Sequence, residues 1–141
     1  TENTQPALLA VSLAAMRATL EQVMTADAYA HMETLAERLA GGLQRVLTTY
    51  DVAWHVVRVG ARVEFICATG PLGHGTQAEA AHAPALEQAI HLALLNRGCL
   101  IAPFHNMMLV SPATTAGQVE TLVQAFESVV ASLALDLGSW Q

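Results

Sequence analysis

Two histidines lie in one loop rich in glycine and small residues, and imidazole is a common metal ligand at neutral pH. His74 and His82 both belong to the stretch TGPLGHGTQAEAAHA. Neither has a helical i, i+4 partner, and neither has a cysteine or an acid at metal-ligand spacing. We therefore interpret both as solvated loop histidines and predict no metal site.

The glycines of this loop do not predict a phosphate site either. GPLGHG lacks the GK[ST] ending of a phosphate-binding loop and its strand, loop and helix order. No histidine comes with an identifiable nucleophile, because the members of a Ser-His-Asp or Cys-His site are matched in space rather than in sequence. The spacing of residues alone therefore assigns no catalytic residue to this chain.

A different connection is the better candidate for a functional loop. Phe104, His105 and Asn106 follow Pro103 and place an aromatic ring, an imidazole and an amide next to one another. They lie between two short apolar runs that read as strands, and loops held by such elements often carry binding residues. A plain surface connection between the strands is the alternative.

The charged residues exclude several classes of partner. All six basic residues are arginines, and twelve acids leave a net charge of −6. An acidic chain without a basic stripe is a poor binder of nucleic acid or of an anionic membrane surface. The absence of lysine also excludes any chemistry that needs a side-chain amine. Charged residues make up only 13% of the chain, so we expect part of its surface to be covered.

The length of the chain and its cysteines indicate the number of domains and the cellular compartment. The 141 residues suffice for one domain, and no window approaches the length of a membrane span. Cys67 and Cys99 lie in apolar runs, which favours buried thiols in a reducing, cytoplasmic compartment. The first residue is Thr1 and no signal peptide follows it, so we expect a processed, trimmed or partial chain.

The periodicity predicts two long helices at the start. The first runs from about Pro6 to Met24 and is apolar nearly all round, so we expect it to be buried against a partner. The second begins near Thr25 or Asp27 and carries apolar residues at three- and four-residue spacing up to Tyr50. Its Gly41-Gly42 pair predicts either a close packing contact or a weak point.

The rest of the chain predicts a small antiparallel sheet with helices. Two strands flank the tight turn Gly60-Ala61, and a helix from Pro84 to Arg97 follows the glycine-rich loop. Two more short strands are expected at Cys99 to Ala102 and Met107 to Ser111. Thr115 and Gln118 form a capping box for the last helix. The fold class predicted is α+β, with about four mainly antiparallel strands.

Several strings, in this order, resemble the C-terminal part of class III pyridoxal-phosphate-dependent aminotransferases. This fold-type I group includes glutamate-1-semialdehyde aminomutase and β-amino-acid aminotransferases. TENTQPALLAVSLAAM is similar to the family's T-x-x-x-N-P string and Ala/Leu-rich helix, and VVRVGARVEFI to its glycine-containing strand pair. The family's helix, short strand, L-x-x-S-P segment and closing helix are similar to the stretch ALEQAIHLALLNRGCLIAPFHNMMLVSPATTAGQVETLVQAF.

The resemblance implies a segment of a homodimeric enzyme that exchanges an amino group between an amine or amino acid and a keto acid. Pyridoxal 5'-phosphate would be held mainly by a larger preceding domain, which would also supply the Schiff-base lysine. This chain alone should therefore be inactive. The family's threonine that donates to the cofactor phosphate of the neighbouring subunit corresponds to Thr1, and Phe104, His105 and Asn106 would line the substrate entrance.

The same resemblance implies a division of the chain. Residues 1–24 would link to the large domain as an interface helix, residues 25–136 would form the C-terminal small domain, and residues 137–141 a tail. PFHNMMLVSP contains no arginine, which argues against a carboxylate clamp from this segment. The alternative from a different class is a free-standing, non-catalytic α+β module that binds a partner protein through its apolar first helix.

Overall fold

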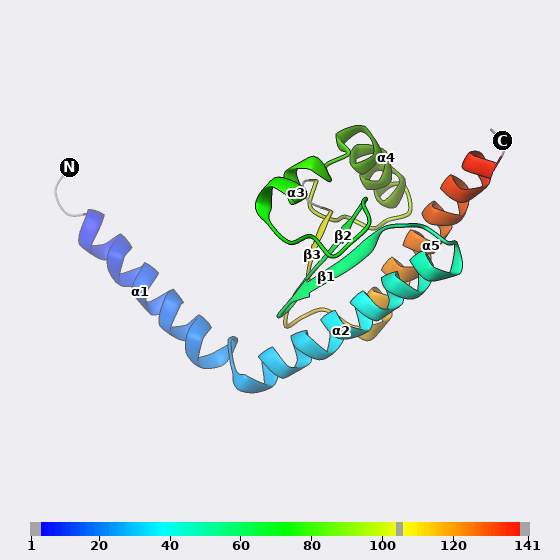
Figure 1. Ribbon diagram of the computed structural model, residues 1–141. Helices are drawn as coiled ribbons and strands as arrows, with labels where there is room; N and C mark the ends of the chain where they lie inside the picture. Colours follow the sequence, from blue (N-terminus) through cyan, green and yellow to red (C-terminus); the bar gives the residue numbers. More distant parts are fainter. Residues whose placement is uncertain (1–3, 104–105, 139–141) are drawn as a thin grey trace.

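The computed structural model of the chain describes residues 4–103 and 106–138, and this part forms five helices and three strands. Their bounds are α1 (Thr4–Gln22), α2 (Ala26–Thr49), β1 (His55–Val59), β2 (Arg62–Ile66), α3 (Gly75–Ala80), α4 (Pro84–Leu95), β3 (Met107–Leu109) and α5 (Ala116–Gly138). Figure 1 shows α1 extending away from the remainder, while α2 and α5 run together beside the sheet. The predicted α+β class with a small antiparallel sheet is confirmed.

The sheet has the order β1-β2-β3, and both pairs are antiparallel. In its register Val56 lies opposite Phe65, and Val63 lies opposite Met108. Gly60 has a φ of 55° at the β1–β2 turn, a left-handed conformation that glycine adopts without steric cost. The hairpin predicted at Gly60-Ala61 is therefore confirmed.

The prediction of about four strands is wrong for the part of the chain that the structure describes. Residues Cys99 to Ala102 form no strand, and β3 ends at Leu109 instead of Ser111. The segment donates one backbone hydrogen bond towards β3, from Ala102 N to Met107 O at 3.0 Å. Strand-like residue types suggested a fourth strand, but a strand needs a ladder of hydrogen bonds with a neighbour.

The loop predicted after β2 contains a short helix that the sequence did not predict. Helix α3 spans six residues. Gln77 Oε1 accepts a hydrogen bond from the Gly73 backbone at 2.7 Å, which ties the loop to the helix. Helix α3 consists mainly of glycine and other small or polar residues, which carry no apolar periodicity, so the sequence pattern did not predict it.

The core lies where α2, α4 and α5 meet the sheet. Phe65 of β2 and Phe126 of α5 are each 1% exposed, and their ring centroids are 4.9 Å apart. The Trp54 ring also stacks with Phe65, with the ring centroids 6.2 Å apart. Further large side chains in this core are Leu43, Leu47, Val63, Ile90, Leu94 and Val130. This aromatic and aliphatic packing fixes the position of β2, which lines the candidate site described below.

Hydrogen-bonded caps set the starts of two long helices, and the sequence predicted the second of these caps. Thr25 accepts a hydrogen bond from Ala28 N at 3.2 Å and begins α2. Before α5, Thr115 N donates to Gln118 Oε1 at 2.8 Å, and Gln118 N donates to Thr115 Oγ1 at 3.2 Å. These reciprocal bonds confirm the capping box and satisfy amide groups that a helix start leaves without partners.

Gly42 lies where α2 packs against α5. A Cβ atom at this position would lie 2.6 Å from Val123 Cγ2, whereas one at Gly41 would have nothing within 4 Å. Of the two alternatives predicted for the glycine pair, close packing therefore applies to Gly42. Glycine allows the two helix backbones to approach at this point.

Candidate functional site

Asn106, one of the three residues predicted to bind substrate, lies directly before β3 and is 5% exposed. Its φ is 44°, and asparagine tolerates this left-handed conformation better than most residues. Its Nδ2 donates a hydrogen bond to the backbone oxygen of Phe65 at 3.3 Å. The amide is therefore held against β2. Phe104 and His105, predicted with it, lie outside the described residues, as does Thr1.

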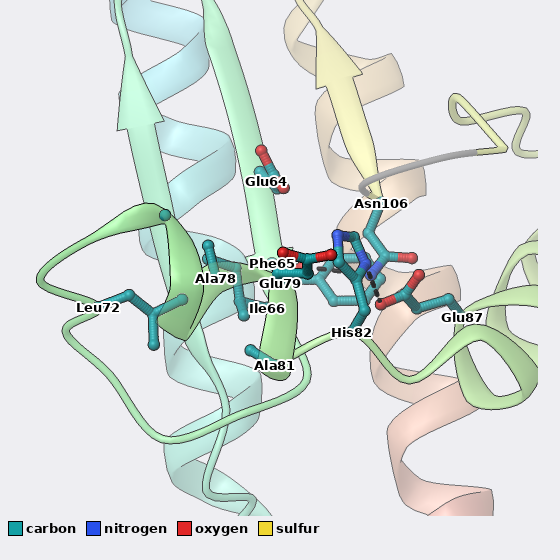
Figure 2. Close-up of a pocket in the computed structure, with 11 residues that line it drawn as sticks. Glu64, Phe65, Ile66, Leu72, Ala78, Glu79, Ala81, His82, Glu87 and Asn106 are labelled. Atoms are coloured by element: carbon teal, nitrogen blue, oxygen red, sulfur yellow. Dashed lines mark hydrogen bonds and ion pairs between the residues drawn. The ribbon is translucent and has the colours of Figure 1, made fainter.

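Beside Asn106 lies a cleft of about 270 Å³. It is bounded by β2, by the loop and helix α3 that follow it, and by the start of α4. Its lining residues are Glu64, Phe65, Ile66, Leu72, Gly75, Ala78, Glu79, Ala81, His82, Glu87 and Asn106. Figure 2 shows Glu79, His82, Glu87 and Asn106 gathered at one end of this cleft, with Leu72 on the opposite side.

The polar residues of the cleft give it an acidic character. Glu64 forms an ion pair with Arg62 at 2.7 Å, which balances its charge. Glu87 Oε1 accepts a hydrogen bond from Ala83 N at 3.1 Å and lies 3.4 Å from His82 Nδ1. No arginine is among the lining residues. The cleft can thus offer acceptors to an amine or a hydroxyl group, whereas it suits an anion poorly.

The charge of Glu87 also reaches a neighbouring thiol. Burial, and secondly the Glu87 carboxylate, raise the pKa of Cys67 to about 12. Burial raises the pKa of Cys99 as well. The nucleophilic form of a cysteine is the thiolate, so both shifts argue against a nucleophilic role at neutral pH. Both cysteines are free thiols, as the sequence predicted, but they are half-buried instead of buried.

The sequence missed two members of the cleft. His82 is an exposed loop histidine, as the sequence predicted, but the sequence did not show that it also lines the cleft and lies 3.4 Å from Glu87. Glu87 itself was not singled out. Its position in the first turn of a helix that begins at Pro84 was a usable signal, because an acidic side chain there bonds free backbone amides.

No group of three or more histidine, cysteine or acidic side chains in residues 4–103 and 106–138 could hold a metal ion. In the same residues, no helix is long and apolar enough to span a bilayer.

Solved structures of two related enzymes resemble the chain over most of its length. A glutamate-1-semialdehyde aminomutase from Pseudomonas aeruginosa PAO1 is 45% identical, with a TM-score of 0.83 over 86% of this chain. A variant of a glutamate-1-semialdehyde aminomutase from the same organism, in complex with PMP, is also 45% identical, with a TM-score of 0.82 over 84%. The chain spans only 27% of the length of the first of these structures and 26% of the length of the variant.

A more distant structure shares the fold. The β-phenylalanine aminotransferase from Variovorax paradoxus is 22% identical, with a TM-score of 0.73 over 82% of this chain and 26% of its own. No protein-family model and no curated protein sequence matches the chain. The resemblance predicted from the sequence, to glutamate-1-semialdehyde aminomutase and β-amino-acid aminotransferases, is confirmed.

Proposed function

We propose that this chain is the C-terminal segment of a pyridoxal-phosphate-dependent aminotransferase, a homodimeric cytoplasmic enzyme that moves an amino group between an amine or amino acid and a keto acid. The observation that carries the proposal is the 45% identity to a glutamate-1-semialdehyde aminomutase over 86% of the chain. The free thiols Cys67 and Cys99 support a reducing compartment. Residues 1–24 link to the larger domain, residues 25–136 form the small domain and residues 137–141 a tail.

The described residues do not fit the cofactor itself. Pyridoxal phosphate, when bound, supplies the electron sink for amino-group chemistry and is attached through a lysine. The chain contains no lysine, and the cleft beside Asn106 is lined by carboxylates that repel a phosphate. The cofactor is therefore held by the remainder of the enzyme, and this chain alone is inactive.

The role of this chain is to shape the substrate side of the site. Phe104, His105 and Asn106 line the entrance, and the hydrogen bond between Asn106 and Phe65 fixes the end of this loop. The acidic cleft beside it suits the amino group of a donor better than a carboxylate. We therefore propose an amine, or an amino acid bound through its carboxylate elsewhere, as the donor.

The test uses the full-length polypeptide that contains this chain. It should be purified with the visible absorption of bound pyridoxal phosphate, and it should transfer an amino group from an amine to an added keto acid. A full-length polypeptide without bound cofactor would favour the free-standing interaction module. Bound cofactor with isomerisation of one substrate, and no transfer to the keto acid, would indicate an aminomutase instead.

We further propose that Thr1 donates to the cofactor phosphate of the neighbouring subunit. A hydroxyl just before a helix suits a phosphate oxygen. Thr1→Ala in the full-length enzyme should weaken cofactor binding by roughly 1.5–3 kcal/mol while leaving the fold intact. Titration of the apoenzyme with pyridoxal phosphate measures the effect, and Thr1→Ser is the matched control that keeps the hydroxyl. Equal affinity of wild type and Thr1→Ala would contradict the assignment.

A further inference from the structure

His55 is the first residue of β1 and does not line the cleft beside Asn106, yet its half-buried side chain contacts the segment that follows β2. Its Nδ1 lies 2.8 Å from the backbone oxygen of Ala68. A carbonyl oxygen only accepts hydrogen bonds, so Nδ1 carries the proton and donates. Nε2 of the same ring is buried and has no hydrogen-bond partner in residues 4–103 and 106–138. The bond to Ala68 is thus the single hydrogen bond that the described residues give this ring.

The contact between this ring and Gly70 is close. A Cβ atom on Gly70 would overlap Cγ, Cδ2 and Nδ1 of His55. A side chain at this position would therefore displace either the ring or the backbone that passes it. The packing adds a steric constraint to the hydrogen bond, two residues further along the chain.

Few other bonds hold residues 68–73, which we call the cleft loop. Within the described part of the chain, no backbone–backbone hydrogen bond involves these six residues. Thr69 Oγ1 donates to Ala53 O at 3.4 Å, a long hydrogen bond. Gly73 N donates to Gln77 Oε1 at 2.7 Å, but that bond joins the cleft loop to α3 and not to the sheet. The bond from the imidazole is therefore the shortest one that ties the cleft loop to β1 and its approach.

The cleft loop and α3 form one wall of the cleft beside Asn106. Figure 2 shows Leu72 of the loop and Ala78 of α3 on the side of the cleft opposite Glu87 and Asn106. None of the residues of α3 is buried, so packing in the core does not fix this helix. The position of the wall therefore depends on how firmly the preceding loop is held.

We propose that His55 is a positioning residue of the amine-donor site. Its bond to Ala68 fixes the cleft loop, and the loop in turn fixes the wall that carries Leu72 and Ala78. The inference rests on the proposed function, in which the cleft receives the amino group of the donor.

Three substitutions of His55 separate the hydrogen bond from the rest of the side chain. Asparagine can keep the bond, because its amide nitrogen is as many bonds from Cβ as Nδ1 is in histidine. Glutamine places its amide one bond further out, and leucine fills space without a donor. The proposal therefore predicts that asparagine preserves the site better than glutamine or leucine does.

Steady-state kinetics of the full-length enzyme test this role. We expect His55→Leu and His55→Gln to raise the KM for the amine donor by about fivefold or more while kcat changes by less than about twofold, because the wall moves but the reacting groups are held elsewhere. His55→Asn should keep KM within about twofold of wild type. The control is His31→Leu, which removes another bond from histidine to a carbonyl, between His31 Nε2 and Thr114 O at 2.9 Å. Neither of these two residues lines the cleft, so KM should not change in the control.

The comparison distinguishes positioning from a general loss of stability, which would lower Tm in both leucine variants without raising KM. An unchanged KM in His55→Leu would overturn the proposal, and so would a KM in His55→Asn as high as that in His55→Leu. If His55→Leu does not fold, Gly70→Ala takes its place, since it keeps the imidazole and displaces the cleft loop. An unchanged KM in that variant would equally overturn the proposal. Variants that bind pyridoxal phosphate and transfer amino groups with unchanged KM would retain the proposed function and lose only this inference.

Discussion

Asn106 combines a left-handed backbone with a buried polar side chain, and both features have a structural reason. The side chain donates to Phe65 O at 3.3 Å, so the amide is satisfied by the backbone of β2. A buried polar group without such a partner would destabilise the fold by about 1–3 kcal/mol. The sequence predicted that this residue belongs to a functional loop, but its bond to a residue 41 positions earlier in the chain depends on the fold.

Two positions before Asn106, at Phe104, we predict an effect on substrate specificity. If Phe104 lines the substrate entrance, Phe104→Ala in the full-length enzyme should lower kcat/KM for bulky or aromatic amines more than for small ones, because apolar contact is lost. Phe104→Arg should instead favour donors with a carboxylate, since guanidinium binds it in a bidentate manner. A panel of small, aromatic and carboxylate-bearing donors is assayed with both variants. Equal effects across the panel would show that the residue does not contact substrate.

Cys67 gives a prediction about pH. Its pKa is raised to about 12, so the folded protein keeps this thiol protonated when the unfolded thiol, with an ordinary pKa of 9.0, already ionises. The resulting stabilisation is complete below pH 9 and is lost as the pH rises towards 12. At pH 8 the thiolate fraction should be about 10⁻⁴, and alkylation of Cys67 in the Cys99→Ser variant should be correspondingly slow. Alkylation at the rate of a free cysteine would contradict this prediction.

At the level of the elements, the glycine pair of α2 offers a matched test. Gly42→Ala should lower the free energy of unfolding by about 1–3 kcal/mol, because its Cβ would lie 2.6 Å from Val123 Cγ2. Gly41→Ala should raise it by about 0.5–1 kcal/mol, because its site is open and alanine favours a helix. Urea denaturation of both variants provides the comparison. Similar effects from the two substitutions would show that α2 and α5 do not approach closely at Gly42.

The sequence predicted those elements whose stabilising contacts lie between residues close together in the chain. The capping box of Thr115 and Gln118 and the turn at Gly60 are local, so their residue types were sufficient. Cys99 to Ala102 has strand-like residues, but pairing requires a neighbour that the residue types do not specify. The cleft was not predicted as a whole, because β2, α3 and α4 bring its residues together only in the fold.

For the whole molecule, α1 is the element that most clearly requires a partner. Leu9, Leu13, Met16 and Leu20 follow one another at alternating four- and three-residue spacing and are each more than half exposed. This spacing places them along one side of the helix, whereas Arg17 and Glu21 pair at 2.7 Å on another. Leu8 and Val11, also more than half exposed, lie on other sides, so apolar side chains continue round the helix, as the sequence predicted. Such a surface is stabilised when a partner covers it.

We predict that α1 is an interface helix of the full-length enzyme. Leu13→Glu should lower Tm by several degrees, because it would bury an unpaired charge. Ala10→Glu adds the same charge near the side of Arg17 and should have a smaller effect. Thermal unfolding of the two variants and hydrogen exchange of α1 test the prediction. Rapid exchange of α1 in the full-length enzyme, with equal Tm changes for both variants, would contradict it.

The hydrogen bond between Asn106 and Phe65 also bears on how this protein can diverge. Phe65 contacts both Trp54 and Phe126, so Asn106 is tied to the packed interior of the domain. A substitution at this position disturbs the fold and the loop together. Neither Phe104 nor His105 is required for that bond, so substitutions there leave this connection to the core intact. If Phe104 and His105 contact substrate, as proposed above, selection can change substrate preference at these two positions while Asn106 keeps its hydrogen bond to the sheet.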